Sequence, residues 1–173
     1  MKKIILAAIA AVFCACSEKG VEKSGAITLQ AYPAVEGAAG NKNCKDFMGR
    51  CMLFQTEKPL FELSGFAFRA RPRGTEDRHN QLEIFLGAEQ AAAFGAIPGK
   101  FIGEGKRLAL VYQGRILHAP KLKARIEAAS VTIDFCNEHV YEVLLASLRG
   151  KTPPGYKFSD DAAWNMCDPV SEN

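Results

Sequence analysis

The stretch that decides the fold is GKRLALVYQGRILHAP, residues 105–120. Its two apolar runs, Leu108–Tyr112 and Ile116–Ala119, are separated by Gln113–Gly114. Short apolar runs joined by two residues that include a turn-permitting glycine predict a β-hairpin. Pro120 has no N–H to donate, so it is expected to end the pairing. The hairpin contains no group typical of catalysis and is interpreted as part of the fold.

Further strands are predicted where apolar residues alternate with polar ones. These segments are 27–31, 51–57, 66–73, 82–86 and 131–135. Pro33 is expected to end the first strand, and residues 34–43, rich in Gly, Ala and Asn, are interpreted as a loop.

Two helices are predicted among these strands. The alanine-rich segment 88–97 is followed by Pro98–Gly99, which is expected to stop a helix. Asn137 is a suitable N-cap for a closing helix, and Gly150 is placed to end it. Hairpins combined with two helices predict an α+β fold with the helices packed on one face of the sheet.

The composition is typical of one globular domain. A chain of 173 residues is long enough for a single hydrophobic core. Hydrophobic residues make up 48% and charged residues 24%, which are ordinary globular values. The formal net charge of +3 includes Lys2 and Lys3, and without them 20 basic residues face 19 acidic ones. A charge so close to neutral predicts no binding to nucleic acid.

Residues 1–15 are interpreted as a bacterial lipoprotein signal peptide. Met1–Lys3 forms a basic leader, and Ile4–Phe13 is an apolar run too short to span a bilayer as a helix. Cys16 follows the small residue Ala15 and is the predicted lipidation site. An ordinary cleaved signal peptide with incidental cysteines is the alternative.

The remaining chain is expected to be held on a membrane that it does not cross. Residues 16–25 are interpreted as a polar tether, 26–150 as the domain and 151–173 as a C-terminal tail. Ser17 after Cys16 lacks the aspartate that commonly retains such lipoproteins in the inner membrane. The expected location is therefore the periplasmic side of the envelope, with the outer membrane favoured.

The cysteines beyond the signal peptide are expected to form disulfides, because export reaches an oxidising compartment. They are Cys44, Cys51, Cys136 and Cys167. An even number predicts two bridges, with three possible connectivities. The local pair Cys44–Cys51 encloses a short polar loop and is favoured, which leaves Cys136 with Cys167. None of the pairs has zinc spacing, so no metal or cofactor is expected.

The arginines of the strand at 66–73 are a candidate binding face. Arg69, Arg71 and Arg73 are expected to point the same way, because side chains alternate along a strand. Three guanidinium groups on one face suit an acidic peptide, a phosphate-bearing glycan or a lipid headgroup. The alternative is an edge strand that its charges keep soluble.

One pair of residues suggests a thiol enzyme. His139 lies close after Cys136, at the expected start of the closing helix. A helix N-terminus can lower the pKa of a cysteine, and a nearby histidine can assist it. The even number of cysteines favours a structural disulfide instead, and no catalytic residue is assigned.

Residues 81–150 follow the order strand, helix, hairpin, strand, helix. The core of the pattern is Gly105–Ala109, the turn residue Gly114 and the ending Ala119–Pro120. Supporting positions are Glu89, Ala91, Phe94, Ile126, Ser130, Ile133 and the stretch Leu144–Gly150. This pattern resembles the head subdomain of the first periplasmic domain of SecD and SecDF, the protein-export auxiliary. The resemblance implies a ferredoxin-like-related fold with an antiparallel or mixed sheet and two helices on one face.

The sequence departs from this family pattern at several points. Gln113 replaces the usual turn aspartate, Ala128–Ala129 stands in place of paired glycines, and Pro98 interrupts a longer helix. The family's transmembrane helices have no counterpart among these residues. The resemblance therefore implies the head, thought in the family to contact polypeptide emerging from the translocon, rather than the proton-driven machine.

The sequence predicts a non-enzymatic, periplasm-facing lipoprotein that binds polypeptide or an envelope protein through the sheet and hairpin surface. Its only expected membrane contact is the lipid anchor. A structural or inhibitory envelope lipoprotein that reuses the fold, without a role in protein export, is the alternative. A thiol oxidoreductase that uses Cys136 is the third hypothesis.

Overall fold

The computed structural model describes residues 20–74 and 79–151. The predicted signal peptide, the lipidation site Cys16, most of the tether and the C-terminal tail with Cys167 lie outside these residues.

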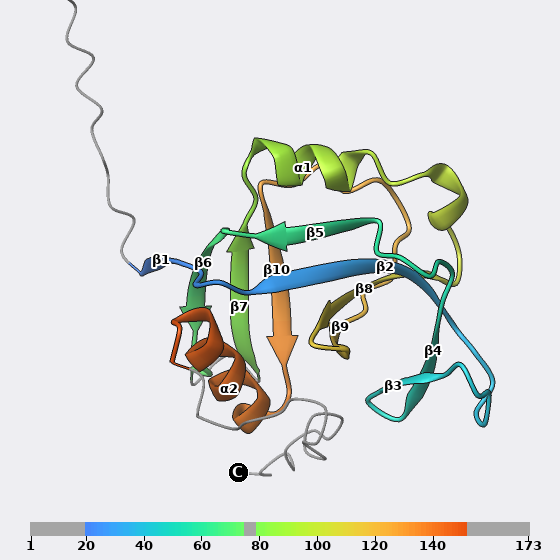
Figure 1. The fold of residues 1–173 in the computed structure, drawn as a ribbon, viewed down its shortest axis with the longest axis horizontal. Helices are drawn as coiled ribbons and strands as arrows, with labels where there is room; N and C mark the ends of the chain where they lie inside the picture. Colours follow the sequence, from blue (N-terminus) through green and yellow to red (C-terminus); the bar gives the residue numbers. More distant parts are fainter. Residues whose placement is uncertain (1–19, 75–78, 152–173) are drawn as a thin grey trace, which may run out of the picture.

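The chain folds into two antiparallel sheets flanked by helices, so the predicted α+β class is confirmed (Figure 1). The first sheet has the order β1 (Val21–Lys23), β6 (Ala67–Arg71), β7 (Asn80–Phe85), β10 (Ser130–Phe135). The second has the order β3 (Lys45–Phe47), β4 (Arg50–Phe54), β2 (Thr28–Glu36), β8 (Lys106–Tyr112), β9 (Arg115–His118), and β5 (Phe61–Ser64) also pairs with β2. The helices are α1 (Ala88–Gly95), the short 3-10 helix η1 (Gly99–Phe101) and α2 (Glu138–Leu148).

The hairpin β8–β9 forms where the apolar runs predict it. Gln113 and Gly114 occupy its turn with φ angles of 46° and 81°. Two consecutive residues at positive φ are typical of a type I′ turn, whose twist matches that of the strands. Glycine adopts this conformation without strain. Gln113 is one of two non-glycine residues at positive φ in the described chain.

Strand β2 runs through Pro33, so the expectation that it ends there was wrong. Pro33 lies opposite Leu108 of β8, and the Leu108 N–H donates to the Pro120 carbonyl (3.1 Å), away from β2. The two residues therefore form a non-hydrogen-bonded pair of the ladder, in which proline removes no bond. On the other edge of β2, the Pro33 carbonyl accepts from the Gln55 N–H (2.8 Å).

The expected loop at 34–43 begins later than predicted, because Ala34–Glu36 belong to β2. The polar segment between Cys44 and Cys51 is also a hairpin, β3–β4, rather than a loop. Met48 and Gly49 form its turn with φ angles of 53° and 72°. β3 is short and exposed and has few apolar residues, so no alternating pattern predicts it.

One hydrophobic core joins the two sheets and both main helices. Phe68, Ile84 and Ile133 of the first sheet meet Leu29 and Leu110 of the second, and all five side chains are at most 1% exposed. In Figure 1, β2 and β5 cross β6, β7 and β10, with α1 beyond β5 and α2 near the opposite end. Phe94 of α1 and the buried side of α2 complete this core.

Helix α2 begins and ends as the sequence predicts. The Val140 N–H donates to the side-chain oxygen of Asn137 (3.0 Å), which caps the first turn. Gly150 has a φ of 69°, and the Lys151 N–H donates to the Ala146 carbonyl (2.7 Å). This is the bond of a Schellman motif, which satisfies a carbonyl of the last turn.

The last part of the predicted tether belongs to the folded domain. Val21–Lys23 form β1, which pairs with β6 at the edge of the first sheet. Both oxygens of Glu22 accept hydrogen bonds from Arg149 at the end of α2, at 2.7 and 2.8 Å. Bidentate pairing of this kind joins the first strand to the last helix and lowers the pKa of Glu22.

Candidate functional site

The arginine face predicted on β6 is largely neutralised within its own sheet. Arg69 and Arg71 both donate to Oε2 of Glu83 in β7, at 3.3 and 2.7 Å. Glu83 also accepts from the Ser130 hydroxyl (3.3 Å), and its side chain is only 15% exposed. Arg69 additionally lies over the ring of Phe85, with 5.1 Å from its Cζ to the ring centroid. These contacts indicate a structural network rather than an open anion site.

Arg73 does not extend this face. β6 ends at Arg71, and Arg73 is exposed beyond it, with its backbone N–H donating to the side-chain oxygen of Asn80 (2.7 Å). The alternative interpretation of an edge strand is wrong as well, because β6 lies between β1 and β7.

The described cysteines are disulfide-bonded, as a structural role requires. Cys44 and Cys51 form the predicted local disulfide, with their Cα atoms 5.1 Å apart. Cys136 is also disulfide-bonded, and Cys167, its predicted partner, lies outside the described residues. A thiol nucleophile at Cys136 requires the reduced form. His139 is exposed on the first turn of α2.

A hollow of about 430 Å³ lies between the β3–β4 turn and the ends of β9 and β10. It is lined by Phe47, Met48, Arg50, His79, His118, Asp134 and Cys136. Burial lowers the pKa of His118 because the charged imidazolium loses water, and the nearby Asp134 carboxylate opposes this only in part.

We expect this histidine to make the fold sensitive to mild acid. A pKa lower in the folded than in the unfolded chain means that the unfolded chain binds the proton more readily. The stability that neutral His118 contributes is therefore present above about pH 6.5 and lost as the pH falls below it. Urea unfolding between pH 7 and 5 should show a smaller loss of stability for His118→Gln than for the wild type. His139→Gln is the control, and an unchanged pH dependence in His118→Gln contradicts the expectation.

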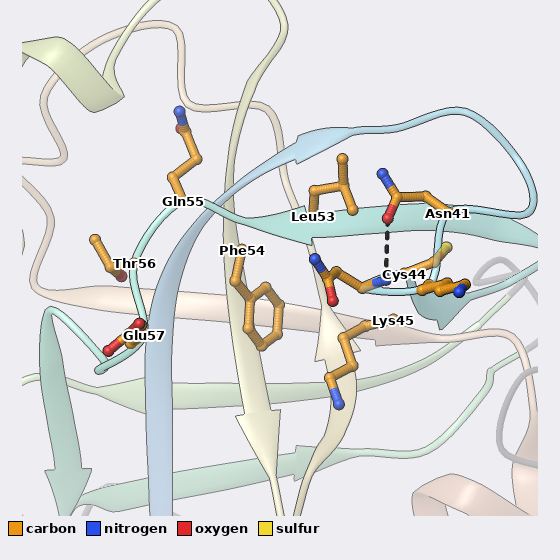
Figure 2. Close-up of a pocket in the computed structure, with 10 residues that line it drawn as sticks. Asn41, Cys44, Lys45, Leu53, Phe54, Gln55, Thr56 and Glu57 are labelled. Atoms are coloured by element: carbon orange, nitrogen blue, oxygen red, sulfur yellow. Dashed lines mark hydrogen bonds between the residues drawn. The ribbon is translucent and has the colours of Figure 1, made fainter.

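A polar pocket of about 580 Å³ lies where β3 begins and β4 ends. Figure 2 shows the Phe54 ring between Lys45 on one side and Thr56 and Glu57 on the other. The full lining is Asn41, Lys42, Asn43, Cys44, Lys45, Leu53, Phe54, Gln55, Thr56 and Glu57. An aromatic ring surrounded by amides, a hydroxyl and charges of both signs is suited to a ligand with both apolar and hydrogen-bonding groups.

The backbone N–H and C=O of Phe54 face this pocket. In the β2–β4 ladder the Gln55 N–H donates to Pro33 (2.8 Å), so Phe54, opposite Ala34, is a non-hydrogen-bonded residue. Its N–H and C=O therefore point to the other edge of β4, where β3 would continue. β3 starts only at Lys45, opposite Met52.

The chain before β3 turns away from that edge. The Asn43 N–H donates to the side-chain oxygen of Asn41, and the Cys44 N–H donates to the Asn41 carbonyl, both at 3.0 Å. Among the residues that the structure describes, no hydrogen bond reaches the Phe54 N–H or C=O. As far as the described chain goes, this leaves a short unpaired edge of β4 in the lining of a polar pocket.

Phe54 itself is held in place by a second, smaller core. Its ring stacks on that of Tyr32, with centroids 4.4 Å apart and planes 11° apart. Both rings pack on a buried cluster on the outer side of β2 and β8, which includes Ala34, Met52 and Val111. No sequence pattern predicts this site, because its residues come from two turns that meet only when β3 pairs with β4.

Other kinds of site have no support in the described residues. No group of three or more His, Cys, Asp or Glu side chains lies close enough there to hold a metal ion. Neither α1 nor α2 is long and apolar enough to cross a membrane.

No protein-family model matches the chain, and comparison with curated proteins gives no match. Among solved structures, one described as "Structure and function of a membrane component SecDF that enhances protein export" is similar, with a TM-score of 0.48 and 19% identity. It covers 76% of this chain and 66% of that chain. The chain resembles SecDF in structure. A second structure, "Crystal structure of SecDF in Super-membrane-facing form", has a TM-score of 0.44 and 19% identity, and covers 62% of this chain and 16% of that chain.

The chain spans less than two thirds of the length of either SecDF structure. At 19% identity the likeness concerns the fold alone.

Proposed function

We propose that this chain is a non-enzymatic domain of the bacterial envelope, anchored through a lipid on Cys16, that binds extended polypeptide. The ligand would lie in the pocket at Phe54 and pair with the free edge of β4. Main-chain hydrogen bonds to a strand edge bind many sequences alike, because every peptide offers the same N–H and C=O groups. A protein that meets unfolded chains of varied sequence needs this kind of recognition.

The N–H and C=O of Phe54, which have no partner within residues 20–74 and 79–151, carry the proposal. The side chains around them suit the same ligand, since Asn43 and Gln55 both donate and accept hydrogen bonds and Phe54 offers apolar surface. The resemblance of residues 81–150 to the SecD and SecDF head supports it independently, because that head is thought to contact polypeptide in the family.

The test compares two substitutions at Phe54. Both Phe54→Pro and Phe54→Ala remove the ring, but only proline removes the N–H, and this N–H makes no bond to β2. We expect Phe54→Pro to bind a fluorescent, proline-free Ser/Thr/Val peptide about tenfold more weakly than Phe54→Ala, as the loss of one hydrogen bond implies. Fluorescence anisotropy measures the affinities, and urea unfolding verifies that both variants fold.

The same peptide with methyl groups on alternate backbone nitrogens is the matched ligand control, and it should bind weakly to every variant. Equal affinities of the Phe54→Pro and Phe54→Ala variants for the unmodified peptide would overturn recognition through the strand edge.

The alternative function is a structural or inhibitory envelope lipoprotein that reuses the fold. A photoreactive residue at Gln55, compared with one at Glu89 on exposed α1, separates the two in the native envelope. Crosslinks from position 55 to many different chains support polypeptide binding. Crosslinks to one folded envelope protein support the alternative.

A further inference from the structure

A second hollow, of about 560 Å³, lies at the end of β2 that is farthest from β1. We name it the lysine cleft, after Lys106, Lys121 and Lys123. Its remaining lining residues are Val35, Glu36, Gly103, Glu104, Gly105 and Arg107.

The cleft is built on a hydrogen-bonded frame. The Leu122 N–H donates to the Lys106 carbonyl (2.8 Å), and the Gly103 N–H donates to the Leu122 carbonyl (2.9 Å). Leu122 is buried at 3% exposure, while Lys121 and Lys123 on either side of it are exposed. Alternation along this extended segment directs both lysines to the side opposite the buried leucine.

The charges of the cleft do not cancel. The guanidinium of Arg107 donates to the Ala119 carbonyl (2.7 Å) and to Glu36, and Glu36 also accepts from Arg50 (3.3 Å). Glu36 is therefore already paired, and Arg107 lowers its pKa. In the described part of the chain, Lys106, Lys121 and Lys123 have no ion pair, and Glu104 is the remaining acidic residue of the lining.

The cleft lining holds four basic residues (Lys106, Arg107, Lys121 and Lys123) and two acidic ones (Glu36 and Glu104). Unpaired ammonium groups around a hollow raise the local concentration of anions. The lysine cleft thus differs from the arginine face, where Glu83 already pairs with Arg69 and Arg71.

The position of the cleft favours a polypeptide anion over a lipid headgroup. β2 has nine residues, so it spans about 30 Å at ~3.3 Å per residue, and it leads from the β1 end to the cleft (Figure 1). An anchor at Cys16 would leave only residues 17–20 before β1. The lipid would then hold the β1 end near the membrane, with the cleft about 30 Å from that end along β2.

We infer that the lysine cleft binds acidic segments of polypeptide. This inference rests on the proposed polypeptide-binding function and adds a second, charge-selective site to the strand edge at Phe54. Carboxylates of an extended acidic segment can reach lysines that come from β8 and from the segment after β9. Ion pairs of this exposed kind contribute mainly specificity and association rate, and they weaken as salt screens them.

The test uses the detergent-solubilised full chain and a fluorescent oligoglutamate peptide. We expect binding that weakens with salt and falls about tenfold in the double variant Lys121→Glu/Lys123→Glu, because each reversal turns attraction into repulsion. The control, Lys23→Glu/Lys58→Glu, makes the same change in net charge at two exposed lysines outside the cleft. Its affinity should stay near that of the wild type.

Equal losses in both double variants would overturn the assignment to the cleft. Binding to phosphatidylglycerol vesicles that depends on Lys121 and Lys123, without binding to oligoglutamate, would show a lipid site and overturn the polypeptide assignment. The Phe54→Pro variant separates the two proposals. Oligoglutamate binding with no binding of the neutral peptide leaves the cleft standing while the strand edge fails, and the reverse result leaves only the strand edge.

Discussion

Phe68→Ala is expected to lower the free energy of unfolding by about 3–5 kcal/mol, the usual cost of emptying a fully buried phenylalanine site. Phe68 is 0% exposed in the middle of β6, where the two sheets and α2 share one core. The neighbouring residues belong to paired strands and cannot collapse into the space that the ring leaves. The loss approaches the total stability of a typical small domain.

Phe85→Ala is the matched control in the adjacent strand. Phe85 points to the outer face of the same sheet, is half-buried and lies beneath Arg69. Its removal should cost only about 1–2 kcal/mol, from lost apolar area and a cation–π contact. Urea unfolding with the disulfides intact measures both variants. Similar losses for Phe68→Ala and Phe85→Ala would show that the core does not lie between the sheets.

The local parts of the fold were predictable from the sequence, because short-range patterns encode them. The β8–β9 hairpin, the Asn137 cap and the Gly150 stop each depend on residues within a few positions. The pairing of β2 was not predictable in the same way. This one strand pairs with β4, β5 and β8, which are far apart in the sequence, and Pro33 is accommodated only because of that register.

In the candidate sites too, local patterns were predictable from the sequence and long-range pairing was not. Alternation along β6 indicates that Arg69 and Arg71 share a face, but it does not reveal that Glu83 lies directly opposite Arg69. Glu83 becomes the counter-ion of these arginines only through the register in which β7 pairs with β6. The lysine cleft had a weak local signal, because Lys121 and Lys123 flank the apolar Leu122. The pocket at Phe54 had none, since it depends on where β3 stops pairing with β4.

Glu83→Ala is expected to destabilise the fold by about 2–3 kcal/mol, because it leaves two arginines side by side without their carboxylate. Arg69 and Glu83 are 24% and 15% exposed at their side chains, so water screens this pair only in part. The cost stays below that of breaking a fully buried ion pair, since Arg71, with its side chain 50% exposed, remains well solvated.

Glu62→Ala provides the matched control for this prediction, measured by the same urea unfolding. Glu62 also lies on a strand, but it is exposed and accepts a hydrogen bond from Gln30 (2.9 Å), so its loss should cost less than about 0.5 kcal/mol. A second variant, Arg69→Leu/Glu83→Leu, removes Glu83 together with the less exposed of its two arginines and should be less destabilising than Glu83→Ala, because only the well-solvated Arg71 is then left without its carboxylate. A loss of stability in Glu83→Ala as small as that in Glu62→Ala would mean that water, rather than Glu83, solvates the arginines. The arginine face would then again be a candidate binding surface.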